Sequence, residues 1–392
     1  MILSSCRKVY TNDTQRTVSP EETLARVEQL LPAAGITRVA DITNLDRIGI
    51  PVFSSIRPTA GPGAVSVYNG KGATPAEAKV SAMMEGIERF SAEVNRHDLR
   101  VERFSRIREE GAALDPASLV LPPGRDPDAP IPWVTGYELG AGEDILVPAS
   151  AVFHPLPSEY PQLFRTSTNG LASGNTMEEA VFHALMEIIE RDAWSLVEAT
   201  RDTGPRVEAI DDPLAESLLG KFRVAGVDVT IKDITSDIGI PTIAAVSDDT
   251  VLQDPTLLTI GMGTHTSARI AVLRALTEVA QSRLTQIHGA REDTTVADIR
   301  KRMGYERTKR MNRYWFASSG NRKFSDIPSF DTSDFLDDIT LAQKRLQKAG
   351  LPKVIVVNLT RETIGVPVVR VIVPGLEVFA MDQERVGRRC HE

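Results

Sequence analysis

The 392-residue sequence predicts a mixed α/β (α+β) fold with pseudo-threefold helix–β-hairpin repeats. Two internal repeats predict it: a helix–Ala-Gly–hairpin unit that occurs three times, and a helix with paired polar residues that also occurs three times. The apolar fraction of 42% and the charged fraction of 25% are typical of globular proteins. We expect residues 1–392 to form a single domain with a core at 8–377, an insertion at 290–331 and a C-terminal tail at 378–392.

Each copy of the first repeat begins with an amphipathic helix followed by an Ala-Gly pair. The expected helices are Glu21–Leu31, Pro213–Val224 and Phe335–Lys348. Gly35, Gly226 and Gly350 are the expected helix ends, because glycine adopts the left-handed conformation without a Cβ clash. Two β-rich runs joined by a short polar turn follow, and the second begins with Ile-Gly-Ile-Pro or Ile-Gly-Val-Pro. We therefore expect a β-hairpin after each helix.

The second repeat places two polar side chains three residues apart on a helix. The pairs are Glu85/Glu88, Glu187/Glu190 and Glu278/Gln281. The first acid of each pair follows the expected N-cap, Thr74, Thr176 or Ser267, by about three helical turns. A Glu three residues after Thr74 and after Thr176 predicts a capping box at both helix starts. The three pairs therefore share one helical phase, and we expect their helices to converge.

The paired acids lie among apolar residues, where carboxylates repel each other and need a partner. Oxygen ligands of this kind suit a hard divalent cation. Structural ion pairs are the alternative, because Arg89, Arg191 and Arg283 follow the acids. Glycine-rich segments also precede the three helices, at residues 69–72, 168–174 and 261–264. Together with an acid cluster that could hold Mg²⁺, these segments argue for a nucleotide polyphosphate.

Composition excludes several other classes of protein. The net charge of −8 disfavours a broad grip on nucleic acid or on an anionic membrane. Cys6 and Cys390 provide neither a disulfide framework nor a CxxC metal motif. Apolar runs are too short for the roughly 20 residues of a membrane span, and the N-terminus lacks the apolar core of a signal peptide. We expect a cytoplasmic protein that binds neither nucleic acid nor membrane.

Three ordered motifs resemble the ATP-binding signatures of the YcaO family. They are Ser81-x-x-x-Glu85-x-x-Glu88-Arg89, Glu187-x-x-Glu190-Arg191-Asp192, and Glu278-x-x-Gln281 with Arg283. The resemblance extends over residues 8–377 and implies a YcaO-type ATP-binding fold. It implies that the catalytic residues and Mg²⁺ ligands are Glu85, Glu88, Glu187 and Glu190. It also implies that the residues contacting ATP or ordering the ligands are Lys8, Arg16, Ser81, Arg89, Arg191, Glu278, Gln281 and Arg283.

The resemblance also implies a reaction. YcaO proteins phosphorylate the oxygen of a peptide backbone amide, so that a nucleophile adds to the amide carbon and phosphate leaves. Members that cyclise Cys, Ser or Thr side chains commonly end in a proline-rich tail, whose carboxylate enters the active site, and work with a peptide-binding partner domain. Residues 383–392 contain no proline, and the chain lacks room for a fused leader-binding domain. These departures favour the stand-alone group that installs thioamides with sulfide and a TfuA-like partner, as in the thioglycine of the methyl-coenzyme M reductase alpha subunit.

Several alternatives stay open at this stage. The product can be an azoline, the chain can be another ATP-dependent enzyme such as a carboxylate–amine ligase, or it can be a non-catalytic ATP-binding scaffold. The peptide or protein substrate, the sulfide source, the number of Mg²⁺ ions and the oligomeric state, a homodimer included, are also open. His265 is a candidate general base. The polar segment 290–331 is either a solvated helical insertion or a docking surface for a peptide or partner.

Overall fold

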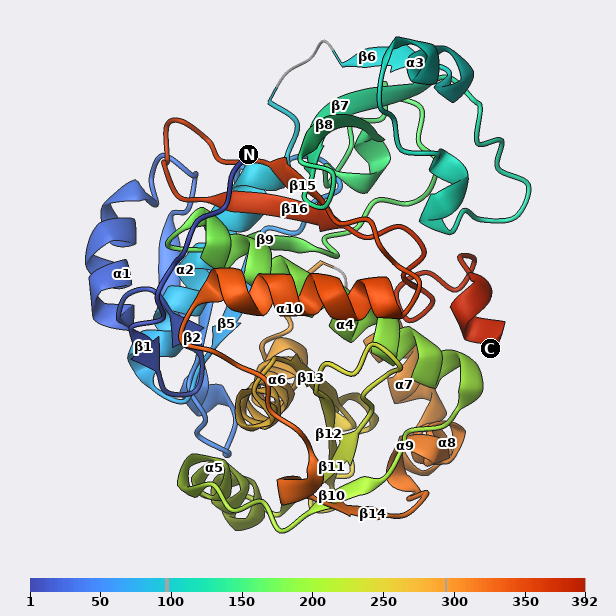
Figure 1. Cartoon of the computed structure of the whole chain (residues 1–392). Coiled ribbons are helices and arrows are strands. Elements are labelled where there is room, and N and C mark those ends of the chain that lie inside the picture. The colour runs from blue at the N-terminus through green and yellow to red at the C-terminus, as the bar shows by residue number, and fades with distance from the viewer. Residues whose placement is uncertain (96–98, 293–294, 392) are drawn as a thin grey trace.

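The computed structural model of the chain describes residues 1–95, 99–292 and 295–391 (Figure 1). Residues 293–294 of the expected insertion and Glu392 of the expected tail lie outside the described residues. The α-helices are α1 (Pro20–Val27), α2 (Pro75–Ala92), α3 (Phe104–Glu110), α4 (Met177–Thr200), α5 (Pro213–Val224), α6 (Ala268–His288), α7 (Thr295–Met303), α8 (Tyr305–Met311), α9 (Arg313–Phe316) and α10 (Phe335–Lys348). The strands are β1 (Tyr10–Thr11), β2 (Gln15–Arg16), β3 (Arg38–Asp41), β4 (Val52–Ile56), β5 (Val67–Lys71), β6 (Arg100–Glu102), β7 (Ile131–Glu138), β8 (Glu143–Pro148), β9 (Leu171–Ser173), β10 (Arg206–Glu208), β11 (Val227–Asp233), β12 (Thr242–Asp249), β13 (Ile260–Thr264), β14 (Asn321–Lys323), β15 (Ile355–Asn358) and β16 (Val368–Ile372).

The three expected hairpins form, and each pairs with a third antiparallel strand that leads into an acid-bearing helix. In the first unit the strand order is β3-β4-β5, and α2 follows β5. In the second unit the order is β11-β12-β13, and α6 follows β13. The third unit joins distant parts of the chain, because the C-terminal hairpin β15-β16 pairs with β9, which precedes α4 (Figure 1). The mixed α/β fold with pseudo-threefold repeats is therefore confirmed.

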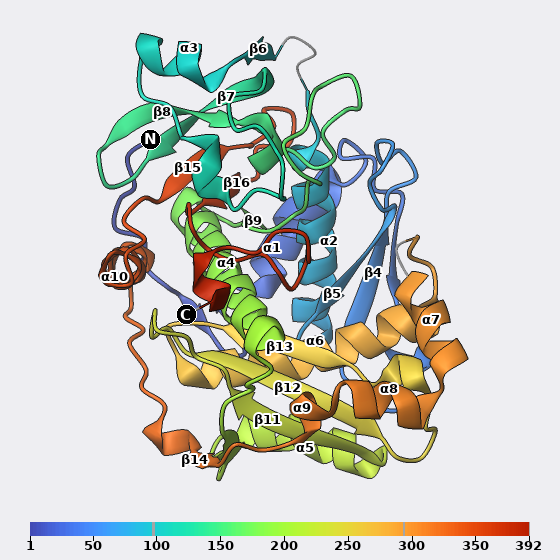
Figure 2. The same ribbon diagram turned by 90° about the vertical axis from the view of Figure 1, so that its right-hand side faces the viewer.

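The three units share one strand register. The first residue of the second hairpin strand pairs with the residue three positions before the N-cap of the acid-bearing helix. These pairs are Val52 with Lys71, Thr242 with Thr264, and Val368 with Ser173. A shift of one residue would move every side chain to the opposite face of the sheet. The shared register therefore gives α2, α6 and α4 equivalent starting points, and Figure 2 shows the three helices meeting in the middle of the molecule.

The glycines of the repeat stand where the backbone requires a left-handed conformation. Gly35, Gly226 and Gly350 have φ angles of 72°, 67° and 80°, as expected for the residue after a helix end. The first expected helix is shorter than predicted, since α1 ends at Val27 and a 3₁₀ turn follows it. Pro32 has no N–H to donate to the preceding turn, so the α-helical hydrogen bonds cannot continue.

Two of the expected N-caps differ in their hydrogen bonds. Thr74 forms the complete capping box, because its hydroxyl accepts from the N–H of Glu77 and the Glu77 carboxylate accepts from the N–H of Thr74. Ser267 is the N-cap residue of α6, but its side chain makes no capping bond. The hydroxyl of Ser329 accepts from the first N–H of α6 instead, at 3.0 Å. A residue far along the chain thus replaces the local cap.

The glycine-rich segments before the helices serve helix packing. A Cβ atom on Gly70 of β5 would overlap the backbone of Ala82 in α2, and one on Gly263 of β13 would overlap the carbonyl of Ala271 in α6. A Cβ atom on Gly174, which follows β9, would likewise overlap the backbone nitrogen of Ala180 in α4. Each helix therefore lies directly on its strand. The close contact explains these glycines without a phosphate ligand, so they are not evidence for a phosphate-binding loop.

Part of the expected insertion belongs to a sheet. Strand β14 pairs in parallel with β10 and forms the edge of the sheet β13-β12-β11-β10-β14. Trp315 of α9 is 1% exposed and packs with Val246 and Met262 of the same sheet. Helices α7 and α8 cover the neighbouring 3₁₀ helix Pro255–Leu257. Among the described helices, none combines the length and apolar character that a membrane crossing needs.

The helix–strand contact predicts a selective effect of adding one methyl group. Gly70→Ala should destabilise the protein by about 1–3 kcal/mol, because the added Cβ must displace the α2 backbone. Gly220→Ala in α5 is the matched control, since nothing lies within 4 Å of its Cβ position and alanine favours helix. Urea unfolding measures both variants. A stable Gly70→Ala protein would contradict the packing account.

Candidate functional site

The acid-bearing helices line one cavity of about 830 Å³. Four positions, spaced alike along α2, α4 and α6, face it. They are Ser81, His183 and Arg274; Glu85, Glu187 and Glu278; Glu88, Glu190 and Gln281; and Arg89, Arg191 and Ser282. Positions separated by three or four residues share one face of a helix. The expectation that the three helices converge is therefore confirmed, and ten of the twelve side chains with expected roles line the cavity, the exceptions being Lys8 and Arg283.

Lys8 lies outside the cavity lining. Its ammonium group is buried and donates hydrogen bonds to Gln15 and Asp338, both at 2.6 Å. A buried ammonium group held by a carboxylate is a structural ion pair, so the structure gives no support to a contact between Lys8 and ATP. His265 also lies outside the lining, where its Nδ1 accepts from the N–H of Ser267 at 2.9 Å. The structure therefore gives no support to His265 as general base.

Arg283 does not face the cavity either. Its side chain is fully buried and donates to Asp46 at 2.8 Å and to Asp249 at 3.0 Å. These carboxylates come from the loop after β3 and from the end of β12, so Arg283 ties the first and second units together. The structure therefore gives no support to a direct contact between Arg283 and ATP, and an indirect role in ordering the ligands stays a prediction. Sequence spacing cannot reveal two carboxylate partners so far from the helix.

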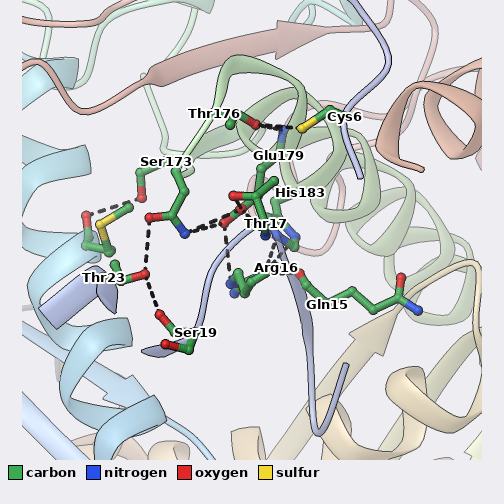
Figure 3. A network of polar contacts seen from close by, with 12 residues as sticks. Cys6, Gln15, Arg16, Thr17, Ser19, Thr23, Ser173, Thr176, Glu179 and His183 are labelled. Atoms are coloured by element: carbon green, nitrogen blue, oxygen red, sulfur yellow. Dashed lines mark hydrogen bonds and ion pairs between the residues drawn. The ribbon is translucent and has the colours of Figure 1, made fainter. Parts of the chain in front are cut away.

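The N-terminal segment reaches the cavity through Arg16 of β2 (Figure 3). Its guanidinium lies 3.6 Å from the carboxylate of Glu179 and contacts the ring of His183 on α4. Burial, followed by Arg16, lowers the pKa of His183 well below its ordinary value, so the neutral ring can accept a hydrogen bond. Glu179 also accepts from the N–H and hydroxyl of Thr17, at 2.9 and 2.8 Å. The expected capping box at Thr176 is therefore only half formed, with Glu179 directed to Thr17 instead.

The cavity lining contains eight charged or titratable side chains that the sequence analysis did not select as site residues. They are Asp13, Lys71, Glu77, Glu179, His183, Arg274, Arg291 and Arg300. His183 and Arg274 stand four residues before the first acid of their helices, so extending the repeat by one helical turn identifies them. Asp13 lies between β1 and β2 and has no equivalent in the repeats. Burial and a hydrogen bond to Glu77 raise its pKa to about 8.

The buried carboxyl groups of α2 and α4 have too little positive charge around them to offset the cost of burial. Burial raises the pKa of Glu88 to about 8, against an ordinary value of 4.5, and Glu187 and Glu85 add to the rise although Arg89 opposes it. Burial also raises the pKa values of Glu187 and Glu190, with Arg191 opposing both shifts. A divalent cation would favour the ionised form of these carboxylates.

Positively charged side chains lie beside the acids but do not offset all of their negative charge. Arg89 lies 3.0 Å from Glu85, and Lys71 pairs with Glu278. Burial tends to raise the pKa of Glu278, but Lys71 and Arg191 offset it and leave this pKa lowered. The Nε atoms of Arg89 and Arg274 are buried without a hydrogen-bond partner among the described residues. Unpaired buried guanidinium nitrogens can serve an anionic ligand.

This donor set fits Mg²⁺ carried by a nucleotide. In the described part of the chain no three acid, His or Cys side chains are close enough to hold a metal ion by themselves. Mg²⁺ usually binds through one or two carboxylates together with substrate phosphates and waters. Glu85, Glu88, Glu187 and Glu190 can supply the carboxylates, and the spare guanidinium donors suit the phosphates. The cavity thus has the chemistry of a site for a metal-bound nucleoside triphosphate.

Comparison with known proteins identifies the family. A family model described as YcaO cyclodehydratase, ATP- and Mg²⁺-binding, matches residues 69–377, which contain all three acid-bearing helices. The chain belongs to the YcaO family of ATP-dependent, peptide-modifying enzymes. The expected family and its cofactors, ATP and Mg²⁺, are thereby confirmed.

Three similar proteins each match this chain over nearly its whole length. The structure of YcaO from Methanopyrus kandleri bound with AMPPCP and Mg²⁺ is 33% identical, with a TM-score of 0.84 and coverage of 98% of both chains. A protein of Methanothermobacter thermautotrophicus is 54% identical over 379 residues, which are 95% of this chain and 97% of the relative. A Rhizobium leguminosarum bv. trifolii protein named for the tfuA 3′ region is 34% identical over 377 residues, covering 93% of this chain and 89% of the relative.

The raised pKa of Glu88 predicts a pH-dependent stability of the metal-free protein. Between about pH 4.5 and about pH 8 the folded chain keeps a proton that the unfolded chain has lost, so stability falls as the pH rises. Glu88→Gln should weaken this dependence and be more stable than the wild type above about pH 8. Urea unfolding in EDTA at about pH 5 and about pH 9 tests it. Glu362→Gln, an exposed site, is the control. Identical pH dependence in the wild type and Glu88→Gln would refute the conclusion that burial disfavours the ionised form of Glu88.

Proposed function

We propose that this YcaO protein uses ATP and Mg²⁺ to convert a peptide backbone amide into a thioamide, with external sulfide as the nucleophile. One observation carries the proposal: carboxylates and spare guanidinium donors from three related helices face the same cavity. The M. kandleri YcaO structure, bound with AMPPCP and Mg²⁺, supports the assignment of a nucleotide to this cavity.

Each group of side chains receives a role in this proposal. Glu85, Glu88, Glu187 and Glu190 hold Mg²⁺, which when bound neutralises charge on the transferring phosphoryl group. Lys71, Arg89, Arg191 and Arg274 bind phosphate oxygens, with Glu278 orienting Lys71. Ser81, Gln281 and Arg16 line the remaining wall and position the nucleotide.

The reaction balances without a redox partner. The amide oxygen attacks the γ-phosphorus of ATP, and ADP leaves. Hydrosulfide then adds to the amide carbon, the C–O bond breaks, and the oxygen departs as phosphate while the carbon keeps sulfur. The proton on sulfur passes to solvent. One ATP and one hydrosulfide give one thioamide, one ADP and one phosphate.

The C-terminal tail supports an external nucleophile. Arg389 lies 2.9 Å from Asp192 on α4 and 2.6 Å from Asp237, so the tail is fixed on the outer side of α4. Met381 lines the cavity, but none of residues 382–391 does. In cyclising members the tail is expected to enter the active site. The contacts of residues 382–391 therefore favour the thioamide group over an azoline-forming enzyme.

The cysteines also support an external source of sulfur. Neither Cys6 nor Cys390 lines the cavity. Burial, with Glu377 adding to it, raises the pKa of the Cys390 thiol to about 12, so this thiol is a poor relay. Sulfide must then be delivered from outside the chain. The R. leguminosarum relative named for the tfuA 3′ region supports a TfuA-like protein as the partner for this step.

The mass of the product tests the proposed function. Incubation of a glycine-containing peptide with Mg-ATP, sulfide, this chain and its TfuA-like partner should increase the peptide mass by the difference between sulfur and oxygen. Glu190→Gln should reduce turnover by at least about a hundredfold, because a lost metal ligand removes several kcal/mol of charge stabilisation. Glu362→Gln should leave it unchanged.

Other outcomes separate the alternatives. Loss of one water from a peptide with Cys, Ser or Thr would establish an azoline-forming enzyme. ATP consumption with a free amino acid and no peptide would indicate a carboxylate–amine ligase. Bound ATP without turnover in the presence of all components would leave a scaffold.

A further inference from the structure

A strongly basic surface covers helices α7, α8 and α9. Residues 297–313 contain seven basic and two acidic side chains, in a chain whose net charge is −8. The basic residues are Arg300, Lys301, Arg302, Arg307, Lys309, Arg310 and Arg313. The proposed chemistry at the cavity does not account for this concentration of charge.

Five of these side chains are exposed and unpaired. They are Lys301, Arg302, Arg307, Arg310 and Arg313, and none forms an ion pair or a side-chain hydrogen bond within the described part of the chain. By contrast, Arg300 donates to the carbonyl of Leu258 and Lys309 pairs with Asp248 at 2.5 Å. Like charges at neighbouring helix positions repel each other. The exposed cations therefore form no ion pair that holds the fold together, and they are available to a ligand.

The surface is firmly attached to the protein. Tyr305 and Lys309 both donate to Asp248 of β12, at 2.5 Å. The buried Trp315 donates from its indole nitrogen to Glu198 of α4 at 3.0 Å. We call helices α7–α9 with their exposed side chains the basic platform. Two large apolar side chains, Ile299 and Met311, are 57% and 61% exposed on it.

The basic platform borders the cavity. Arg300 of α7 lines the cavity, and so do Arg291, just before α7, and Leu258, which accepts a hydrogen bond from Arg300. Figure 2 shows α7 and α8 side by side, and both helices contact the 3₁₀ helix Pro255–Leu257 that precedes β13. A polypeptide that leaves the cavity on this side would pass over the platform and its exposed cations.

We propose that the basic platform binds an acidic stretch of the polypeptide whose amide is activated in the cavity. The proposal rests on the proposed function and extends it to the substrate, since it requires Asp or Glu residues beside the modified position. Complementary charge increases the rate of encounter and disfavours uncharged or basic polypeptides. Ile299 and Met311 can accept apolar side chains among the acids.

Peptide binding tests the platform without any turnover. The probe is a fluorescent glycine-centred peptide with an Asp/Glu-rich flank, compared with the same peptide carrying Asn and Gln. Fluorescence anisotropy should show at least about tenfold tighter binding of the acidic peptide, a difference of about 1.4 kcal/mol. The preference should weaken as salt rises. Equal affinity of the two peptides would overturn the proposal.

Variants locate the effect on the platform. Lys301→Gln/Arg307→Gln/Arg310→Gln should remove the preference, while KM for ATP stays unchanged. Arg108→Gln/Arg125→Gln/Arg223→Gln changes the net charge equally at exposed positions outside the platform and should keep the preference. Equal losses in both sets would show a general charge effect and overturn the proposal. Unfolding measurements confirm that each variant is folded.

Charge reversal provides the sharpest contrast. Lys301→Glu/Arg307→Glu/Arg310→Glu should bind a Lys-flanked peptide better than the acidic peptide, which a merely structural role would not produce. Displacement of the acidic peptide by single-stranded RNA at equal or lower concentration would assign the platform to nucleic acid and contradict the proposal. Charge-dependent peptide binding without a thioamide product would refute the proposed reaction and leave the platform assignment standing.

Discussion

Glu88, Glu187 and Glu190 share one cavity, where burial raises the pKa of each carboxyl group. Keeping several acids together in this way costs free energy in the metal-free chain, and the neighbouring arginines offset only part of it. A metal-bound nucleotide in this cavity would supply the missing positive charge and would accept hydrogen bonds from the spare guanidinium donors. The repulsion among the acids would in that case add to the binding free energy of the cofactors.

Pseudo-threefold symmetry explains how acids from distant parts of the chain come together. The N-cap of each acid-bearing helix stands three residues after a strand that pairs, in one shared register, with a hairpin. In the third unit this hairpin comes from the C-terminal part of the chain, while strand β9 and helix α4 come from the middle. The position of the proposed metal and nucleotide ligands thus depends on β-sheet pairing as much as on the helices that carry them.

Local patterns in the sequence predict the helical phase, the hairpins and the convergence of Glu85, Glu187 and Glu278, because these depend on spacing within each repeat. Contacts between distant residues are not visible in such patterns. Lys8 forms an ion pair with Asp338, and Arg283 forms one with Asp46, so neither cation lines the cavity. Arg274, in contrast, can be predicted from the sequence, because extending the repeat of polar positions by one helical turn identifies it.

The central claim is that α2 and α4 together hold the metal of one nucleotide site. Crystals of the chain grown with AMPPCP and Mn²⁺, in place of Mg²⁺, would locate the metal by its anomalous scattering. The account predicts Mn²⁺ in the cavity, in contact with at least one carboxylate from Glu85 or Glu88 and one from Glu187 or Glu190. Mn²⁺ held by the acids of a single helix, or bound outside the cavity, would contradict it.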